Sequence, residues 1–203
     1  MFEINHLHFS YDTNVIFDNF SFNIDKGEIM CIIGKNGSGK TTLLKVLCGL
    51  NYCPTLDCKI DNNPINQNEL KKYVTYIPAS PNFYESLTTE EYISWLRSLW
   101  KKDEKYIKKV YDYMRLLQLE VDKNSEISTF SLGMKYKLYF CSFLALDNSI
   151  LLLDEPLNSL DIASRELAIS LIKQYIQEHN GYCLFSSHVK DTISNLATKT
   201  ISI

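Results

Sequence analysis

A segment near position 40 has the residue types and the spacing that bind a polyphosphate. Its sequence, GKNGSGKT from Gly34 to Thr41, fits the pattern G-x-x-x-x-G-K-[ST] with an additional Gly37. Glycines let consecutive backbone N–H groups point inward and bind an anion without Cβ clashes. Lys40 supplies positive charge for the β- and γ-phosphates, and the Thr41 hydroxyl is a hard oxygen ligand for Mg²⁺. The predicted nucleotide-binding residues of this loop are Gly34, Lys35, Asn36, Gly37, Ser38, Gly39, Lys40, Thr41 and Thr42.

Two adjacent carboxylates form the second chemical feature. Asp154 and Glu155 come directly after the aliphatic run of residues 150–153. Ligands of open α/β sheets bind at the carboxyl ends of the strands, which is where such a pair would lie. Asp154 can belong to the Mg²⁺ shell, and Glu155 can orient and deprotonate an attacking water. Taken alone, the pair could equally be two solvated acids that start a loop; the phosphate-binding loop favours the chemical roles.

Buried strands and the helices between them must position these residues. Continuous apolar runs predict strands buried on both faces at residues 29–33, 150–153 and 182–185. Helices are predicted at residues 40–50, 131–146 and 162–179. Strands and helices that alternate with short connections indicate an α/β sheet surrounded by helices.

Two further regions differ from this alternating core. Residues 2–9 and 20–24 alternate apolar and polar side chains, which predicts half-buried antiparallel strands. Between about 85 and 120, Thr88 and Glu91 predict a capping box that opens one amphipathic helix. A second amphipathic helix is predicted from the spacing of Ile107, Val110, Tyr111, Met114 and Leu117. We therefore expect one domain over residues 1–203, with a helical subdomain inserted at approximately 82–130.

Composition narrows the class of protein. Lys and Arg total 21 and Asp and Glu total 24, a net charge of −3 with His neutral, which argues against nucleic-acid binding by bulk charge. The sequence has no apolar run of about 18 residues and no secretory signal at its start, so a cytoplasmic protein is predicted. The cysteines are expected to be reduced and unligated, because no further ligands accompany the pair Cys53 and Cys58.

With these motifs in place, the sequence resembles the nucleotide-binding subunit of ATP-binding-cassette (ABC) transporters over essentially its whole length. The segment Phe130–Met134 looks like the family signature in an LSLGM form, and Pro156 follows Glu155 as is usual. The segment Ser159–Asp161 matches the family's D-loop, and His188 matches its switch histidine. Tyr11 lies where the family places an aromatic ring that stacks on adenine.

The resemblance implies a fold and a set of roles. The fold is an α/β P-loop NTPase core with an antiparallel β-subdomain and an inserted helical subdomain. Two subunits would pack head to tail around ATP and Mg²⁺, and Ser131, Leu132 and Gly133 of one would close over the γ-phosphate held by the other. Glu155, His188 and Lys40 would be catalytic, Asp161 would be the D-loop residue, and Thr41 and Asp154 would hold Mg²⁺. From the residues alone, Ser131 could be only a helix cap, and His188 only a satisfied polar residue.

One position departs from the family pattern. After the predicted strand at residues 73–77 the family usually has a Gln that contacts Mg²⁺ and the attacking water, whereas this sequence has Ala79. A methyl group cannot ligate a metal, and Ser80 or Asn82 could substitute only in a different loop register. We therefore expect altered metal coordination or altered coupling at an otherwise intact ATP site.

Together these features predict an ATPase subunit that drives a separately encoded integral membrane permease and lies peripherally on the inner face of the cell membrane. The LSLGM form and the short chain favour an exporter, by family analogy. The second subunit could be identical or related. The alternative is a regulatory or structural cassette subunit that binds ATP and scarcely hydrolyses it. A cassette protein that acts on ribosomes or DNA is disfavoured because the sequence has no basic stripe.

Overall fold

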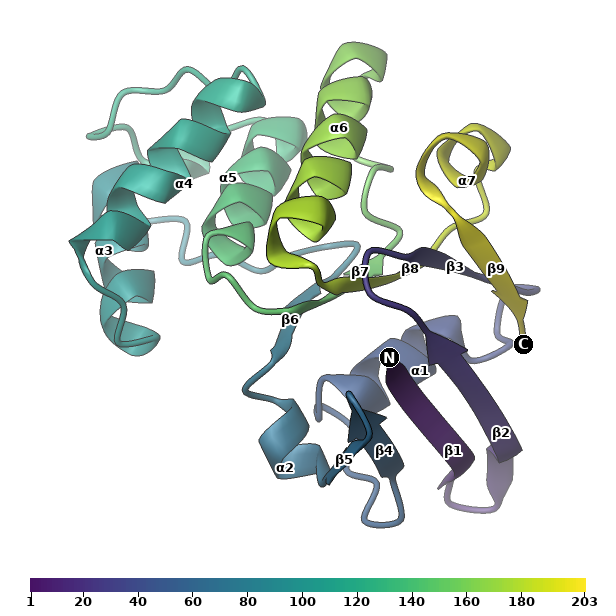
Figure 1. Ribbon diagram of the computed structural model, residues 1–203. Helices are drawn as coiled ribbons and strands as arrows, with labels where there is room; N and C mark the ends of the chain where they lie inside the picture. The colour runs from purple at the N-terminus through teal and green to yellow at the C-terminus, as the bar shows by residue number, and fades with distance from the viewer. The chain divides into compact units, whose positions relative to one another are not determined.

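A computed structural model describes residues 1–203, which form two compact units (Figure 1). The first unit comprises Met1–Tyr76, Asn148–Pro156 and Lys173–Ile203, and the second comprises Ile77–Asp147 and Leu157–Ile172. None of the helices combines the length and the apolar character that crossing a bilayer requires. The extent of the inserted subdomain stays a prediction.

The first unit contains an antiparallel sheet of strand order β2-β1-β4-β5. Its strands are β1 (Phe2–Tyr11), β2 (Asn14–Ile24), β4 (Asp57–Ile60) and β5 (Asn63–Ile65). The two strands predicted near the N-terminus are confirmed, and they extend further than predicted because they join in a hairpin that pairs Tyr11 with Asn14. Asp12, at the tip of this hairpin, has a positive φ of 49°, as tight turns often require.

A second sheet has the strand order β6-β7-β8-β3-β9, and the pairs β7–β8, β8–β3 and β3–β9 are parallel. Its strands are β6 (Val74–Ile77), β7 (Ile150–Asp154), β8 (Tyr182–Ser186), β3 (Ile29–Ile33) and β9 (Lys199–Ser202). All residues of β7 and β8 are buried, which confirms what their continuous apolar runs predict. Parallel register brings the carboxyl ends of β3, β7 and β8 to one edge of the sheet.

The first unit has one helix that is shorter than predicted and two short helices that were not predicted. Helix α1 (Lys40–Leu47) ends three residues before the predicted limit, because Gly49 turns the chain with a φ of 74°. Two short helices were not predicted: α2 (Gln67–Leu70), which Asn66 and Glu69 close with a capping box, and α7 (Lys190–Leu196). A four-residue helix is too short to give a periodic signal.

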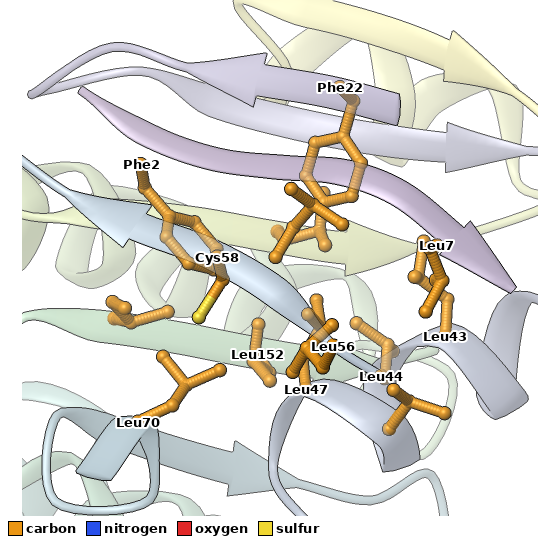
Figure 2. Packing of buried hydrophobic residues seen from close by; sticks show 14 of the residues in the cluster. Phe2, Leu7, Phe22, Leu43, Leu44, Leu47, Leu56, Cys58, Leu70 and Leu152 are labelled. Atoms are coloured by element: carbon orange, nitrogen blue, oxygen red, sulfur yellow. The ribbon is translucent and has the colours of Figure 1, made fainter. Parts of the chain in front are cut away.

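Helix α1 is fixed by a continuous apolar core (Figure 2). Leu43, Leu44 and Leu47 of α1 have no exposed surface. They pack in one cluster with residues of both sheets, among them Phe2, Leu7, Phe22, Cys58 and Leu152. Burying each such side chain contributes roughly 1.5–3 kcal/mol, so the cluster holds rigidly the helix that follows the phosphate-binding loop.

The second unit is helical. Its helices are α3 (Thr89–Leu99), α4 (Glu104–Leu116), the 3₁₀ turn η1 (Ile127–Thr129), α5 (Leu132–Leu144) and the first part of α6 (Ile162–His179). The predicted capping box is present: the Thr88 hydroxyl accepts a hydrogen bond from the Glu91 N–H at 3.2 Å, and Glu91 accepts one from the Thr88 N–H at 2.8 Å. Both predicted amphipathic helices are confirmed.

Aromatic residues of this unit divide into a core set and a surface set. Tyr92, Tyr106 and Tyr136 are buried. Tyr84, Trp95 and Trp100 are 64%, 40% and 42% exposed, and the Tyr84 and Trp95 rings meet edge to face with centroids 5.3 Å apart. The exposed set of Tyr84, Trp95 and Trp100, which we call the aromatic surface, is therefore available to a partner.

Candidate active site

The loop between β3 and α1 has the backbone that an anion-binding loop requires. Gly39, which caps α1, has a φ of 104°, a conformation that side-chain-bearing residues rarely adopt. A Cβ at Gly34 would lie 2.5 Å from the Ser38 Oγ and 2.6 Å from the Ile203 carbonyl oxygen, so only glycine fits there. The N-terminus of α1 therefore opens directly onto this loop, where its unpaired N–H groups favour a bound anion.

The loop itself holds the ammonium group of Lys40. Lys40 Nζ donates to the carbonyl oxygens of Gly34 and Lys35 at 2.9 and 3.0 Å, and the residue is only 9% exposed. An ammonium group has three donors, so one N–H remains for a phosphate oxygen. The loop's own carbonyl oxygens thus orient the Lys40 side chain.

Asp154 ends β7 beside the first turn of α1. The Thr41 hydroxyl donates to its carboxylate, with Oγ1 lying 3.1 Å from Oδ1 and 2.9 Å from Oδ2. The Tyr76 hydroxyl lies 3.4 Å from Oδ2, and the Ser186 hydroxyl donates to Oδ1 at 2.7 Å. A carboxylate and a hydroxyl side by side are hard oxygen donors, which fits a Mg²⁺ ion that also takes phosphate oxygens.

Glu155 is held in an unusual backbone conformation. Its φ is 47°, in the left-handed region, which typically costs a non-glycine residue about 1–3 kcal/mol and persists only when neighbours enforce it. Its N–H is bonded to the Ser186 hydroxyl at 3.0 Å and to the Ser186 carbonyl oxygen at 3.2 Å. Its carboxylate oxygen Oε1 lies 2.9 Å from His188 Nδ1. The structure therefore brings the predicted base and the predicted switch histidine into direct contact.

One cleft of about 370 Å³ in the first unit is lined by eight of the predicted site residues. Its lining comprises Ile16, Asn36, Gly37, Gly39, Lys40, Thr41, Thr42, Asp154 and Glu155. Gly34, Lys35 and Ser38 do not line it and instead shape the loop; for example, the Lys35 carbonyl accepts from the Ser38 N–H at 3.1 Å. The cleft lies within the usual size range of small-ligand pockets.

Tyr11 is the predicted nucleotide-binding residue that lies apart from these. It is 45% exposed, is absent from the cleft lining, and its hydroxyl accepts a hydrogen bond from Asn51 Nδ2 at 2.6 Å. Its stacking on adenine stays a prediction.

Sequence reasoning missed Ile16, Tyr76 and Ser186 as site residues. The only available signal was that Tyr76 and Ser186 lie at or next to the carboxyl ends of predicted strands.

The signature residues belong to the second unit and begin α5. Ser131 caps this helix, because its hydroxyl accepts from the Met134 N–H at 3.2 Å. Leu132 is 68% exposed, and a Cβ at Gly133 would lie 3.2 Å from the Ser159 carbonyl oxygen. The cap is confirmed, whereas the proposed contact with another subunit's γ-phosphate stays a prediction.

Asp161 caps α6 in the same unit. Its carboxylate accepts hydrogen bonds from the N–H and the hydroxyl of Ser164, at 2.9 and 2.8 Å, and these bonds lower the pKa of Asp161. A carboxylate with a lowered pKa stays ionised at neutral pH.

Ala79 is half-buried and presents only a methyl group. Altered metal coordination or altered coupling at this position therefore stays a prediction.

The cysteines are free thiols, and most are buried. Cys31 of β3 lies near the site, and burial raises its pKa to about 11. A thiol with so high a pKa stays protonated and unreactive at neutral pH. Cys31 therefore contributes packing rather than chemistry.

The glycine-rich loop before α1 and the carboxylate pair at the end of β7 are the parts of a nucleotide-binding site. A model of the ABC transporter family matches residues 17–158, and the chain belongs to that family. It is an ATP-binding subunit of an ABC transporter, and its enzyme class is ATPase, as the sequence predicted.

Three known proteins illustrate the likeness. The chain is 34% identical to the cytochrome c biogenesis ATP-binding export protein CcmA of Reclinomonas americana, over 86% of this chain and 78% of that protein. It is also 34% identical to the energy-coupling factor transporter ATP-binding protein EcfA1 of Fusobacterium nucleatum, over 86% and 68%. A solved dimeric, post-hydrolysis structure of the ATP-binding cassette MJ0796, bound to ADP and Pi, superposes with a TM-score of 0.85 at 22% identity and covers 100% of this chain and 94% of that one. The predicted ABC ATPase fold is confirmed.

Proposed function

We propose that this chain binds ATP with Mg²⁺ in the cleft of the first unit and hydrolyses it to drive a separately encoded integral membrane permease. The observation that carries the proposal is the convergence of Lys40, Thr41, Asp154 and Glu155 on one cleft. His188 contacts the carboxylate of Glu155 from the neighbouring strand end. Phosphate binding, a metal shell and a base are the parts that ATP hydrolysis needs.

The reaction follows from these positions. The remaining N–H of Lys40 and the loop N–H groups hold the phosphates and stabilise the charge that develops on them. Glu155 takes a proton from water while the water oxygen bonds to the γ-phosphorus, and the bond from that phosphorus to the bridging oxygen breaks. ADP leaves with the electron pair, and His188 Nδ1 keeps the Glu155 carboxylate oriented. When bound, Mg²⁺ neutralises charge between the β- and γ-phosphates; Thr41 and Asp154 would hold it.

A second subunit completes the site in this proposal. Ser131 caps a 13-residue helix, α5, and Leu132, the first residue of that helix, is 68% exposed. Such a helix end favours an anion, but the glycine-rich loop of this chain already binds the phosphates of its own nucleotide. We therefore assign Ser131, Leu132 and Gly133 to the γ-phosphate held by a second cassette subunit, identical or related.

The permease would bind at least partly through the aromatic surface. Tyr84, Trp95 and Trp100 project from the helical unit and are each at least 40% exposed. Large exposed aromatic residues are typical anchors of protein interfaces. Binding there would hold this chain on the inner face of the membrane. Export is the proposed direction, because the signature segment Phe130–Met134, which reads FSLGM, resembles the LSLGM form and the relative CcmA is named an export protein.

Replacing Glu155 tests the reaction. A general base contributes about 10²–10⁴ in rate, so Glu155→Gln should lose Mg²⁺-dependent phosphate release by about that factor and still bind ATP. Glu166→Gln, at an exposed position of α6, is the matched control and should hydrolyse at the wild-type rate.

Ala79 favours the second candidate function, a cassette that binds ATP without turnover. Equal and negligible phosphate release from wild type and Glu155→Gln would establish that function instead.

Replacing the aromatic surface tests the partner. Trp95→Ser and Tyr84→Ser should abolish co-purification with a permease expressed from the neighbouring gene, while phosphate release by the isolated chain is unchanged. Tyr52→Ser, which changes a tyrosine in the first unit that is 72% exposed, is the matched control. If the aromatic variants still co-purify with the permease at wild-type yield, the aromatic surface is not its binding site.

A further inference from the structure

We infer that Ser186 is a positioning residue that couples the proposed metal ligand to the proposed base. Its single hydroxyl touches both: it bonds the side chain of Asp154 and the main chain of Glu155. The inference rests on the roles proposed above for these two acids and adds the group that sets their relative geometry.

The hydroxyl of Ser186 can make these contacts in only one orientation. Ser186 is the last residue of β8, has no exposed surface, and pairs with Asp154 in the parallel register of β7 and β8. An ionised carboxylate only accepts hydrogen bonds, and a backbone N–H only donates. The Ser186 O–H must therefore donate to Asp154 Oδ1, at 2.7 Å, while its oxygen accepts from the Glu155 N–H at 3.0 Å.

This bridge has consequences on each side. On the Asp154 side, the Thr41 hydroxyl reaches both carboxylate oxygens, and the Tyr76 hydroxyl lies 3.4 Å from Oδ2. The bond from Ser186 to Oδ1, at 2.7 Å, is the shortest of these contacts and therefore contributes most to holding the rotation of the carboxylate. On the Glu155 side, the accepted N–H belongs to a residue whose φ is 47°, a conformation that needs enforcement. Two residues further along the same strand end, His188 meets the Glu155 carboxylate. Ser186 thus fixes the spacing between the metal ligand and the base.

Loss of the hydroxyl should loosen this geometry without unfolding the chain. In Ser186→Ala, Asp154 keeps its bonds from Thr41, and the Glu155 N–H keeps its 3.2 Å bond to the Ser186 carbonyl oxygen. The parallel pairing of β7 and β8 uses backbone groups only, so it is unaffected. The two partners therefore stay hydrogen-bonded, but no single hydroxyl bridges the Asp154 carboxylate and the Glu155 N–H any longer.

The experiment compares Ser186→Ala with wild type in two independent measurements: the kcat of phosphate release, and the affinity for ATP with Mg²⁺ and with EDTA. Groups that orient metal ligands typically change metal affinity or activity by about 10–100-fold, so we expect a loss of that size in kcat and a weaker gain in ATP affinity from Mg²⁺. Affinity in EDTA should stay within about twofold, because the Ser186 hydroxyl bonds Asp154 and Glu155 and not the phosphate-binding loop. Ser186→Thr keeps the hydroxyl and should restore activity.

Matched variants separate positioning from general damage. Ser142→Ala removes another fully buried serine hydroxyl, bonded to the Leu138 carbonyl at 2.8 Å, and should leave both measurements unchanged. Ser186→Cys fills the site with a weak hydrogen-bonding group and should reproduce the losses if Ser186→Ala does not fold. Unchanged kcat and Mg²⁺ response in Ser186→Ala or Ser186→Cys, or an equal loss of ATP affinity in EDTA, would overturn the inference. Glu155→Gln tests the proposed function separately: if it loses turnover and Ser186→Ala does not, only the role of Ser186 is wrong.

Discussion

The two units hold their functional residues in contrasting ways. In the first unit, Asp154 is 6% exposed and receives hydrogen bonds from the hydroxyls of Thr41 and Ser186, while the loop holds Lys40. In the second unit, Leu132 of the signature is 68% exposed, and the Ser131 hydroxyl accepts a hydrogen bond from its own helix, from the Met134 N–H at 3.2 Å. Hydrogen bonds within the chain thus hold the phosphate-binding residues, whereas the signature begins a capped helix with an exposed leucine. Changes in the first should alter nucleotide binding, and changes in the second should alter only steps that need a partner.

Lys40→Ala gives the largest expected effect and tests the first unit. Loss of the charge at the phosphates removes an electrostatic contact that strengthens as the reaction proceeds, so phosphate release should fall on the order of 10³-fold. ATP binding, measured by equilibrium dialysis, should weaken as well. Lys45→Ala, in the same helix, is the control and should bind ATP like wild type. Full ATP affinity in Lys40→Ala would contradict the idea that the loop organises the site.

Leu44→Ala tests whether the core under the loop sustains that organisation. Leu44 has no exposed surface and packs in the cluster that holds α1, so its truncation should lower the free energy of unfolding by about 3 kcal/mol. Denaturant unfolding measures this change. Leu116→Ala in α4, at a position 51% exposed, should change stability by less than about 0.5 kcal/mol. Similar losses in the two variants would mean that the core is not where the structure places it.

Ser131→Ala tests whether the signature serine of the second unit acts in hydrolysis as well as capping its helix. It should lower the free energy of unfolding by about 1 kcal/mol through loss of the helix cap and reduce phosphate release by about tenfold, with unchanged ATP affinity. Thr88→Ala removes the cap of α3 at a similar cost in stability but should leave hydrolysis unchanged. If both variants lose hydrolysis to the same extent, the signature serine acts only as a cap.

Asp61→Asn gives the smallest expected effect. Asp61 bonds Lys26 at 2.6 Å and the amino group of Met1 at 2.9 Å, and these contacts hold its pKa well below the usual range. A lowered pKa contributes stability that is complete above the unfolded value of about 3.9 and is lost as pH falls through the folded value. The side chain is 43% exposed, so the contribution should stay below about 1 kcal/mol. Unfolding at pH 7 should therefore distinguish wild type from Asp61→Asn slightly, and the difference should shrink in strong acid. A difference that grows as the pH is lowered would refute this assignment.

The sequence predicted those elements that have a continuous apolar run or a capping motif. The apolar runs of β3, β7 and β8 gave the buried strands, and Thr88 with Glu91 gave the start of α3. The exposure of Tyr84, Trp95 and Trp100 was not predictable, because amphipathic spacing does not distinguish a ring that faces the core from one at the edge of the apolar stripe. Helices α2 and α7 escaped prediction because four and seven residues carry too little periodicity.

The sequence by itself determined the chemistry. The glycines, Lys40 and Thr41 act through local backbone freedom and residue type, and they are adjacent in the chain, so their order alone specifies an anion loop followed by a helix. Which side chains from distant parts of the sequence come into contact follows from the tertiary structure alone. The register of β7 against β8 pairs Asp154 with Ser186 and brings His188 to Glu155 across 33 positions of sequence, and it assigns the bridging contact to a serine that no motif singles out. Strand register depends on the packing of the whole sheet, and no short segment encodes it.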